Sequence, residues 1–147
     1  MKAIQLDAYG GPEVLQLRNV IDPVAGAGEL VVDIYAASVN PVDWKIRNGA
    51  RKDNLELNFP YTPGIDFSGV VRAAADVTEF GAGDEVFGVT PQTQQGTYAD
   101  AIAVDASLVA RVSPQVSPMW IPRPWLLSGR RLSYRWIGSA SHQVKRS

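Results

Sequence analysis

Few side chains of this 147-residue chain could perform chemistry, because it has no cysteine and a single histidine, His142. Without cysteine there is no thiolate nucleophile, no disulfide and no Cys-ligated zinc site. A catalytic triad can be drawn with His142, a serine and an aspartate, but one of each is expected by chance. The composition therefore argues against a metal centre and against histidine-based catalysis.

The strongest local signal for a functional site is the start of a predicted short helix. Asn40 is a good N-cap, Pro41 suits the first helical position, and Asp43 is favoured near the positive end of a helix dipole. Gly49 is suited to end the helix. Such a helix projects Lys45 from a rigid, capped start, while Asn40 and Asp43 serve at least as capping groups.

A glycine-rich nucleotide fingerprint is missing from the sequence. Residues 25–28 and 81–83 are rich in glycine, but neither stretch matches G-x-G-x-x-G or leads into a helical pattern. Gly83 and Asp84 are instead expected to form a tight turn before the next strand.

Around these residues the chain shows many short β-type runs separated by Gly, Pro and Asp turns. This pattern is typical of a small barrel or sandwich. The fold class is therefore mainly β, with one or two short helices, and the helix after Asn40 is inserted between two strands. The predicted strands cover residues 2–8, 14–20, 29–39, 66–74, 85–89, 97–104 and 108–112.

The charge distribution divides the chain near Pro118. Residues 1–118 hold 8 Lys+Arg and 15 Asp+Glu, whereas residues 119–147 hold 6 Lys+Arg and no acid, so charges of −7 and +6 sum to −1. The second part also carries three of the four tryptophans. This step predicts a domain over residues 1–118 and an atypical basic, Trp-rich tail over residues 119–147.

Several interpretations of the tail stay open. Basic residues interleaved with aromatics could form an arm for nucleic acid or a membrane surface, although two prolines interrupt any helix early. Alternatively the tail is disordered or the product of a frameshift. Met119-Trp120-Ile121 must be encoded as ATG-TGG-AT, which two bases later reads Val-Asp and continues residues 116–118 as an acidic linker.

The sequence shows no pattern typical of membrane insertion or of export, which bears on the expected compartment and partners. No apolar run approaches the ~20 residues that span a bilayer, and the N-terminus has no signal-peptide pattern. With no disulfides either, a cytoplasmic protein is expected, with no membrane and no nucleic acid as partner.

Five motifs follow one another along the body of the chain. They are MKAI with YGGPEVL in residues 1–15, ASVNPVDWKIRNG at 37–49, FPYTPGIDFSGVV at 59–71, GDEVFG at 83–88 and GTYAD at 96–100. In order and spacing these motifs resemble the catalytic domain of the medium-chain dehydrogenase/reductase superfamily. Within it, the sequence is similar to the zinc-independent quinone oxidoreductase and enone reductase branch. The resemblance covers nearly all of residues 1–113 and implies a GroES-like, partly open β-barrel.

Two departures from the superfamily pattern shape the expectations. Its zinc alcohol dehydrogenases carry a cysteine near residues 41–43 and a His-Glu pair in a later motif, and this chain has neither, so no zinc is expected. Members continue into a Rossmann nucleotide-binding domain. Here the similarity ends near Ser113, so the Rossmann domain is expected to be absent.

The resemblance also implies roles for individual residues. Lys45 and Asn40 would be catalytic, and Asn40, Pro41 and Lys45 would contact NADP(H). A cation such as Lys45 stabilises the negative oxygen formed when hydride reaches an enone, and it can relay a proton. Tyr61 and Thr62 would border the substrate cleft. The other motif residues are expected to be structural: Asp43, Gly64, Asp66, Gly69, Gly83 and Asp84.

The expected function is that of a truncated quinone oxidoreductase. The complete enzyme would pass a hydride from NADPH to a quinone or an α,β-unsaturated carbonyl, whereas this chain is expected to be inactive alone. One alternative is a non-catalytic interaction module that forms homodimers through an exposed apolar face of the domain. Another is a half-enzyme that recruits a separate nucleotide-binding chain.

Overall fold

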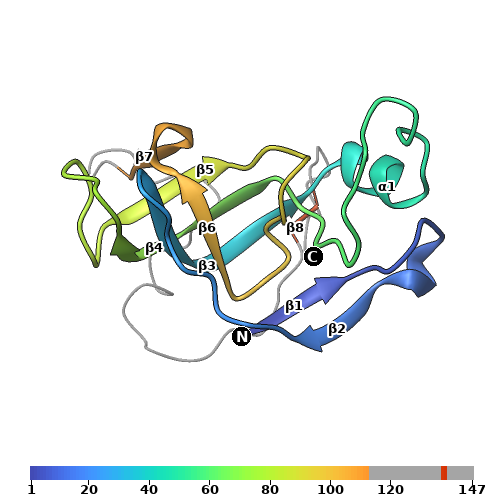
Figure 1. The fold of residues 1–147 in the computed structure, drawn as a ribbon, viewed down its shortest axis with the longest axis horizontal. Coiled ribbons are helices and arrows are strands. Elements are labelled where there is room, and N and C mark those ends of the chain that lie inside the picture. Colours follow the sequence, from blue (N-terminus) through green and yellow to red (C-terminus); the bar gives the residue numbers. More distant parts are fainter. Residues whose placement is uncertain (113–136, 139–147) are drawn as a thin grey trace, which may run out of the picture.

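The computed structural model describes residues 1–112 and 137–138, which form two sheets and one α-helix (Figure 1). A small antiparallel sheet contains β1 (Lys2–Gln5) and β2 (Gln16–Asn19). The larger sheet has the strand order β6-β3-β4-β5-β7. Its members are β3 (Glu29–Val39), β4 (Asp66–Ala74), β5 (Glu85–Val89), β6 (Ala101–Asp105) and β7 (Val109–Arg111).

The predicted mainly β, partly open barrel is confirmed. The strands β6 and β7 lie at opposite ends of the hydrogen-bonded order, so the described sheet does not close on itself. The helix α1 (Pro41–Arg47) follows β3 directly, and two 3₁₀ turns cover Pro12–Val14 and Ala106–Leu108. The two-residue strand β8 (Ile137–Gly138) pairs in parallel with the end of β3 that leads into α1.

The long strand β3 organises the larger sheet because it pairs with β4 on one side and β6 on the other. Its register against β4 shifts between Val31 and Val32 and again between Ile34 and Ala36. Such bulges increase the local twist and bend a strand, which curls the sheet around its apolar face.

The barrel interior is a single apolar cluster built by alternation along the strands. Every second residue of β3 from Leu30 to Ile34 points inward, and Phe67 on β4 is fully buried among them. Gly69 allows β3 and β4 to approach, since a Cβ there would lie 1.9 Å from the carbonyl oxygen of Asp33. The cluster comprises Leu30, Val32, Ile34, Phe67, Val71, Val86, Ile102 and Val104.

A second, smaller apolar cluster joins α1 to the N-terminal strands. Ile46 on α1 packs with Leu6, Leu57 and Tyr61. The backbone of Leu6 exchanges hydrogen bonds of 2.9 Å in both directions with that of Tyr61. This cluster fixes the buried side of α1, and therefore decides which side chains the helix leaves exposed.

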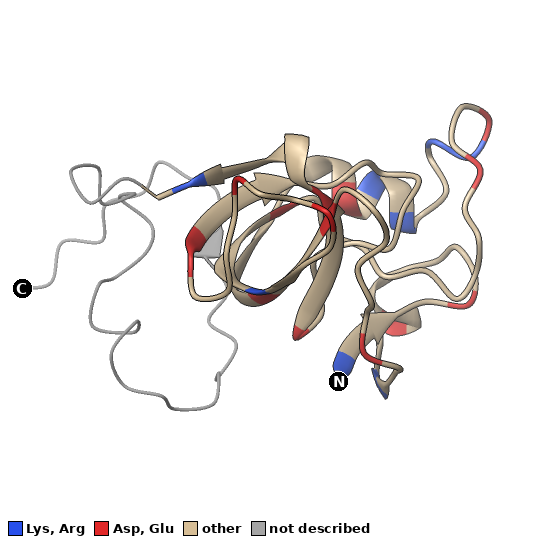
Figure 2. Ribbon diagram, turned by 60° about the vertical axis from the view of Figure 1, so that its left-hand side comes forward, with Lys and Arg blue, Asp and Glu red and all other residues tan. Residues whose placement is uncertain are grey.

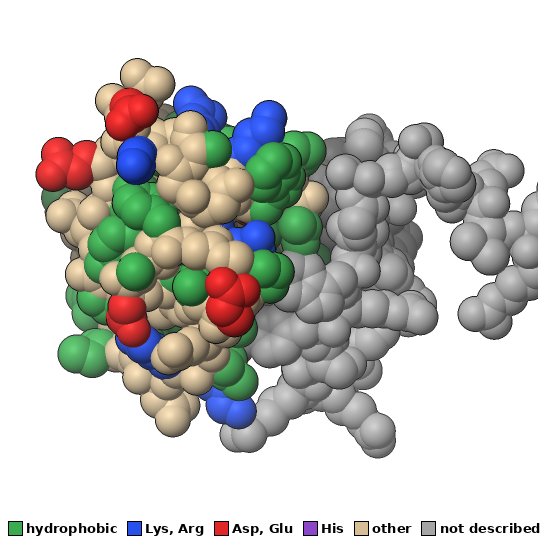
Figure 3. All heavy atoms as spheres, turned by 90° about the vertical axis from the view of Figure 1, so that its right-hand side faces the viewer, with side chains coloured by type: hydrophobic (Ala, Val, Ile, Leu, Met, Phe, Trp, Pro, Cys, Tyr) green, Lys and Arg blue, Asp and Glu red, His purple; other side chains and the backbone are tan. Residues whose placement is uncertain are grey.

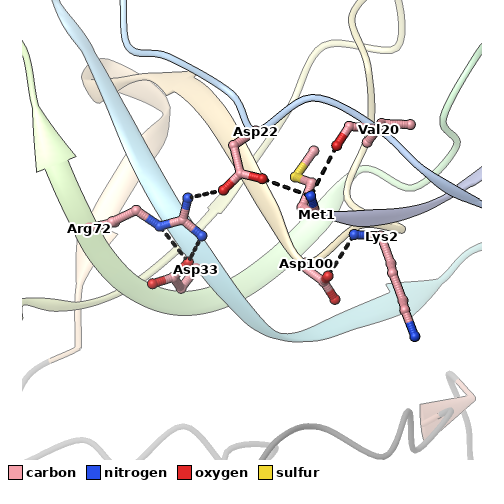
Figure 4. Close-up of polar contacts among 7 residues, drawn as sticks. All are labelled: Met1, Lys2, Val20, Asp22, Asp33, Arg72 and Asp100. Atoms are coloured by element: carbon pink, nitrogen blue, oxygen red, sulfur yellow. Dashed lines mark hydrogen bonds and ion pairs between the residues drawn. The ribbon is translucent and has the colours of Figure 1, made fainter.

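Ion pairs tie the N-terminus to the outer surface of the larger sheet (Figure 4). The N-terminal ammonium of Met1 lies 2.7 Å from Asp22, and Arg72 on β4 bonds Asp22 and also Asp33 on β3, each at 2.9 Å. The side chains of Asp22, Asp33 and Arg72 are substantially solvated, so each pair contributes little to stability on its own.

The structure corrects three predicted strands. The run predicted over residues 2–8 is a strand only to Gln5, because the backbone of Leu6 bonds Tyr61 instead of continuing the pairing with β2. The run predicted from Val14 begins as a 3₁₀ turn after Pro12, and the strand starts only at Gln16. The run predicted over 97–104 is a strand only from Ala101, because residues 97 and 98 bond the backbone of 63–64 instead. Apart from residues 137–138, the predicted tail over 119–147 lies outside the described residues.

No helix in the part of the chain that the structure describes is long and apolar enough to cross a bilayer.

Candidate functional site

The start of α1 is held by a buried carboxylate. Asn40 and Asp43 form a capping box, in which Asp43 Oδ2 accepts the backbone N–H of Asn40 at 2.6 Å. The same oxygen accepts the hydroxyl of Tyr98 at 3.0 Å. Asp43 is only 5% exposed. One oxygen therefore joins the helix start to a segment 55 residues further along the chain.

This buried charge changes the acidity of its surroundings. Burial raises the pKa of Asp43, and the negative charge of Asp66 adds to the rise, while bonds from Asn40 and Tyr98 oppose it. Burial, together with the charge of Asp43, raises the pKa of Tyr61 to about 12. The same causes raise the pKa of Tyr98 further. Both phenols therefore stay protonated at neutral pH and act as hydrogen-bond donors.

A second polar group lies where β3 passes into α1. Asp66 Oδ2 accepts the hydroxyl of Ser38 at 2.6 Å and the side-chain amide of Asn40 at 2.7 Å. The amide nitrogen of Asn40 also donates to Ser38 Oγ at 3.1 Å. Both amide hydrogens of Asn40 are thus used within the protein, and the side chain is held in one orientation.

Tyr61 and Thr62, which were predicted to border a substrate cleft, are buried. They are 2% and 3% exposed. The Tyr61 hydroxyl donates to the carbonyl of Gln92 at 3.1 Å, and the Thr62 backbone N–H donates to the side chain of Gln95 at 2.8 Å. In this structure both residues connect the segment 60–64 to the loop 91–96, and their contact with substrate stays a prediction.

The two segments cross at a pair of glycines. Gly64 has a φ of +97°, and a Cβ there would lie 2.4 Å from Thr97 Oγ1. A Cβ on Gly96 would lie 2.2 Å from the carbonyl oxygen of Gly64. Only glycine fits on either side of this crossing, which brings Tyr98 against Asp43.

The remaining motif residues lie in the barrel, and the structure does not bring them to α1. Gly69 is in the middle of β4, against Asp33 of β3. Gly83 has a φ of +95° in the turn before β5. There Asp84 accepts the backbone N–H of Gly81 and the guanidinium of Arg111, both at 2.8 Å.

The predicted ligand-facing residues of α1 share its exposed side. Pro41 and Lys45 are exposed, and so are Trp44 and Asn48, at the spacing of three and four residues that aligns side chains on one helix face. Lys45 Nζ lies 5.7 Å from the centroid of the Trp44 ring. We call these four residues the α1 stripe. Basic residues gather on α1 and the following turn (Figure 2), and from this end hydrophobic and basic side chains lie next to each other (Figure 3).

Sequence reasoning missed three residues of the candidate site: Tyr98 and Ser38, which bond distant aspartates, and Trp44, which lies beside Lys45. Tyr98 lies in the GTYAD motif, which was noted as a whole without assigning a role to its tyrosine. Ser38 is a hydroxyl at the end of an apolar strand, two residues before the cap, and this position was a usable signal. Trp44 was taken as an ordinary member of its motif, although helical spacing places it beside Lys45.

Comparison with known proteins identifies relatives of this chain. The model of the alcohol dehydrogenase GroES-like domain matches residues 26–114. A quinone oxidoreductase from Sus scrofa is 41% identical over 108 residues, which cover 71% of this chain and 32% of that protein. The chain spans about a third of the length of the curated relatives it matches.

Solved structures agree with the sequence relatives. The quinone oxidoreductase from Coxiella burnetii aligns with a TM-score of 0.70 and 32% identity, over 80% of this chain and 38% of that one. A mycobacterial protein solved with NADPH aligns with a TM-score of 0.69 and 31% identity, over 80% and 35% of the two chains. This chain therefore belongs to the alcohol dehydrogenase GroES-like domain family, in the quinone-oxidoreductase-like part of the medium-chain dehydrogenase/reductase superfamily.

Proposed function

We propose that this chain provides the substrate side of a zinc-independent, NADPH-dependent oxidoreductase that passes a hydride to a quinone or an α,β-unsaturated carbonyl. The observation that carries this proposal is the exposed cation Lys45, one helical turn after the anchored Asn40, in a chain whose relatives are quinone oxidoreductases. We also propose that it acts in the cytoplasm on small molecules rather than on nucleic acid or membrane.

The described residues fit one end of NADPH. Pro41 and Lys45 offer an exposed ring and a cation that would hold the nicotinamide and its ribose, and the fixed side chain of Asn40 would shape the floor beneath them. A pyrophosphate needs successive backbone amides at a helix N-terminus after a glycine-rich turn. In the described residues, Gly28 and Gly83 have positive φ but lead into β3 and β5, not into helices. The fit is therefore limited to the nicotinamide end.

When bound, NADPH supplies the hydride. Lys45 would lie near the substrate oxygen, where a positive charge stabilises the enolate or phenolate that forms, and its ammonium can return a proton to that oxygen. Asn40 contributes by shape and orientation, because Ser38 and Asp66 already take its amide hydrogens. Asp43 fixes the helix that presents Lys45.

The proposal is tested with the intact chain and with a chimera. The purified chain, mixed with NADPH and 1,4-benzoquinone, is expected to leave the 340 nm absorbance unchanged, because the sequence lacks a nucleotide fingerprint. Residues 1–112, placed in the Coxiella burnetii quinone oxidoreductase instead of the aligned segment, are expected to restore NADPH oxidation.

Within the chimera, Lys45→Met is expected to lower kcat by ~10²-fold, as general acid–base and electrostatic groups usually do. Lys52→Met removes an exposed cation from the turn after α1 and serves as the matched control. Equal activity of the two variants would remove Lys45 from the mechanism. A chimera that folds and binds NADPH but reduces no quinone or enone would contradict the function itself.

One observation favours a second candidate, an interaction module. Phe87 and Val89 are 37% and 49% exposed, two residues apart on the same face of β5. Neighbouring apolar side chains on a sheet face can bury each other in a dimer. Sedimentation equilibrium of the chain and of Val89→Asp distinguishes the candidates, since a dimer through this face is expected to dissociate in the variant.

A further inference from the structure

We propose that Trp44 is the ring-stacking residue of a binding site for flat quinones on the α1 stripe, and that Lys45, whose ammonium lies over the indole ring, turns from it to take a carbonyl oxygen. This inference rests on the proposed function for the identity of the ligand. It adds a residue whose role does not follow from capping, from the barrel or from the hydride-transfer scheme.

The exposure of Trp44 requires a reason. Its side of α1 faces outward, while Ile46, two residues later, is 3% exposed within the second apolar cluster. Trp44 itself is 47% exposed. Tryptophan has a large apolar surface, and a half-exposed ring loses much of the stabilisation that burying this surface would give. Exposed apolar groups beside polar ones often mark ligand contacts.

The charge around the ring determines which ligands it suits. Residues 45–53 contain four basic side chains and one acid. Arg47 is partly used, since its Nε donates to the carbonyl of Gly10 at 3.3 Å. Lys45 stays exposed, and within residues 1–112 its ammonium is in no ion pair. The Lys45 ammonium lies over the indole ring, 5.7 Å from its centroid. Because the lysine stem is flexible, this cation can turn from the ring to a ligand oxygen with negative charge or lone pairs.

The electron density of the rings favours a quinone over the nicotinamide of NADPH as the ligand of Trp44. An indole is electron-rich, a quinone ring is electron-poor, and stacked rings of opposite character attract. The reduced nicotinamide of NADPH is itself electron-rich and carries its carbonyl on an amide. A quinone also presents two ring oxygens in the plane of stacking, where Lys45 can reach one of them.

The first test uses binding alone and needs no cofactor. In the full chain, Trp120, Trp125 and Trp136 are replaced with Phe, so that Trp44 is the single tryptophan and its emission is selected by exciting at the red edge of the absorption band, where tyrosine does not absorb. Quenching by 2-methyl-1,4-naphthoquinone is expected to saturate while the fluorescence lifetime stays constant, which shows a stacked complex. A lifetime that falls in proportion to intensity shows collisions only and overturns the proposal. The chain has no cysteine, so no thiol can trap the quinone.

The second test compares matched variants by isothermal calorimetry. Trp44→Ala is expected to weaken quinone binding by roughly tenfold, the usual effect of losing one stacked ring. Tyr35→Ala removes an exposed aromatic from β3 and is expected to leave binding unchanged. Lys45→Met is expected to weaken 1,4-naphthoquinone-2-sulfonate more than the neutral quinone. Equal losses in the alanine variants, or no loss in either, overturn the proposal.

Two further results would also overturn it. Reduced nicotinamide mononucleotide that binds as tightly as the quinone and depends on Trp44 assigns the ring to the cofactor. Sedimentation that shows a dimer dissociated by Trp44→Ala assigns it to a second copy of the chain. The proposed function fails separately: quinone bound at Trp44 with an inactive chimera contradicts that function, whereas an active chimera without such binding contradicts only this inference.

Discussion

The barrel interior is packed with apolar side chains, whereas the start of α1 is held by hydrogen-bonded carboxylates. The interior formed by β3, β4, β5 and β6 is apolar throughout its cluster, and Phe67 at its centre is fully buried. The start of α1 is held by Asp43 and Asp66, whose oxygens accept hydrogen bonds from three side chains and one backbone amide. The barrel gains stability by excluding water, whereas the helix start gains a fixed geometry from directed bonds.

The difference between the two regions indicates where this fold tolerates a buried charge. A buried carboxylate is costly unless each oxygen is well bonded, so it is placed where a functional helix must be held still. The barrel needs no such orientation, since any inward apolar packing of the right volume stabilises it. Variants that disturb the two regions should therefore differ in size of effect and in dependence on pH.

The largest expected effect is in the barrel. Phe67→Ala leaves a cavity in the main cluster and is expected to lower the free energy of unfolding by about 3–5 kcal/mol. Urea denaturation followed by far-UV circular dichroism measures it. Phe87→Ala, on the neighbouring strand and 37% exposed, is the matched control and should cost much less. Equal costs would mean that the cluster does not dominate stability.

A smaller loss is expected at the helix start. Asp43→Ala removes the oxygen that accepts the Tyr98 hydroxyl and the backbone N–H of Asn40. It is expected to lower the free energy of unfolding by about 2–3 kcal/mol. Asp53→Ala, in the exposed turn after α1, is the control and should be nearly neutral. The same urea measurement applies, and a neutral Asp43→Ala would show that the capping carboxylate can be replaced by water.

Removing one donor should cost less than removing the acceptor. Tyr98→Phe loses the bond to Asp43 while keeping the ring, and is expected to cost about 1 kcal/mol. It should also raise the pKa of Asp43 further, because a donor that favours the carboxylate is gone. Carboxyl carbon NMR of the titrating chain measures that pKa, and Tyr35→Phe is the exposed control. An unchanged or lowered pKa contradicts the predicted contact.

The smallest expected effect is a change in the free energy of unfolding with pH. The folded state raises the pKa of Asp43 above its ordinary 3.8, so it binds more protons than the unfolded state just above that pH. The contribution of Asp43 to stability is therefore present at low pH and lost as the pH rises through this window. The difference in unfolding free energy between the chain and Asp43→Asn should fall with rising pH. Exposed aspartates with lowered pKa values, such as Asp7, make a contribution to stability that rises with pH. Because this contribution is the same in both proteins, it cancels in the difference.

Sequence reasoning predicted the elements better than the contacts between them. The strands at 29–39, 66–74 and 85–89 coincide with the observed bounds, because alternation and flanking turns are local signals. The helix start was predicted for the same reason, as Asn40, Pro41 and Asp43 lie within four residues. Its exposed Lys45 also follows from helical spacing.

The bonds that complete the site were out of reach because they join distant segments. Nothing local marks Tyr98 as the partner of Asp43, and the glycines that let their segments cross are 32 positions apart in the sequence. The burial of Tyr61 and Thr62 is likewise a tertiary effect, since it depends on Gln92 and Gln95. Residue types indicate which groups could bond, but only the packed chain decides which of them meet.

The bond between Tyr98 and Asp43 also sets an order of assembly during synthesis. At about 5–20 residues per second, a ribosome needs roughly three to eleven seconds to add the 55 residues that separate them. Until then α1 can form with its local bond from the Asn40 backbone to Asp43, and β3 can pair with β4, but the bond from Tyr98 is missing. The bond from Tyr98 and the β6 side of the barrel core, with Ile102 and Val104, are therefore both completed late, when residues 98–105 have left the ribosome.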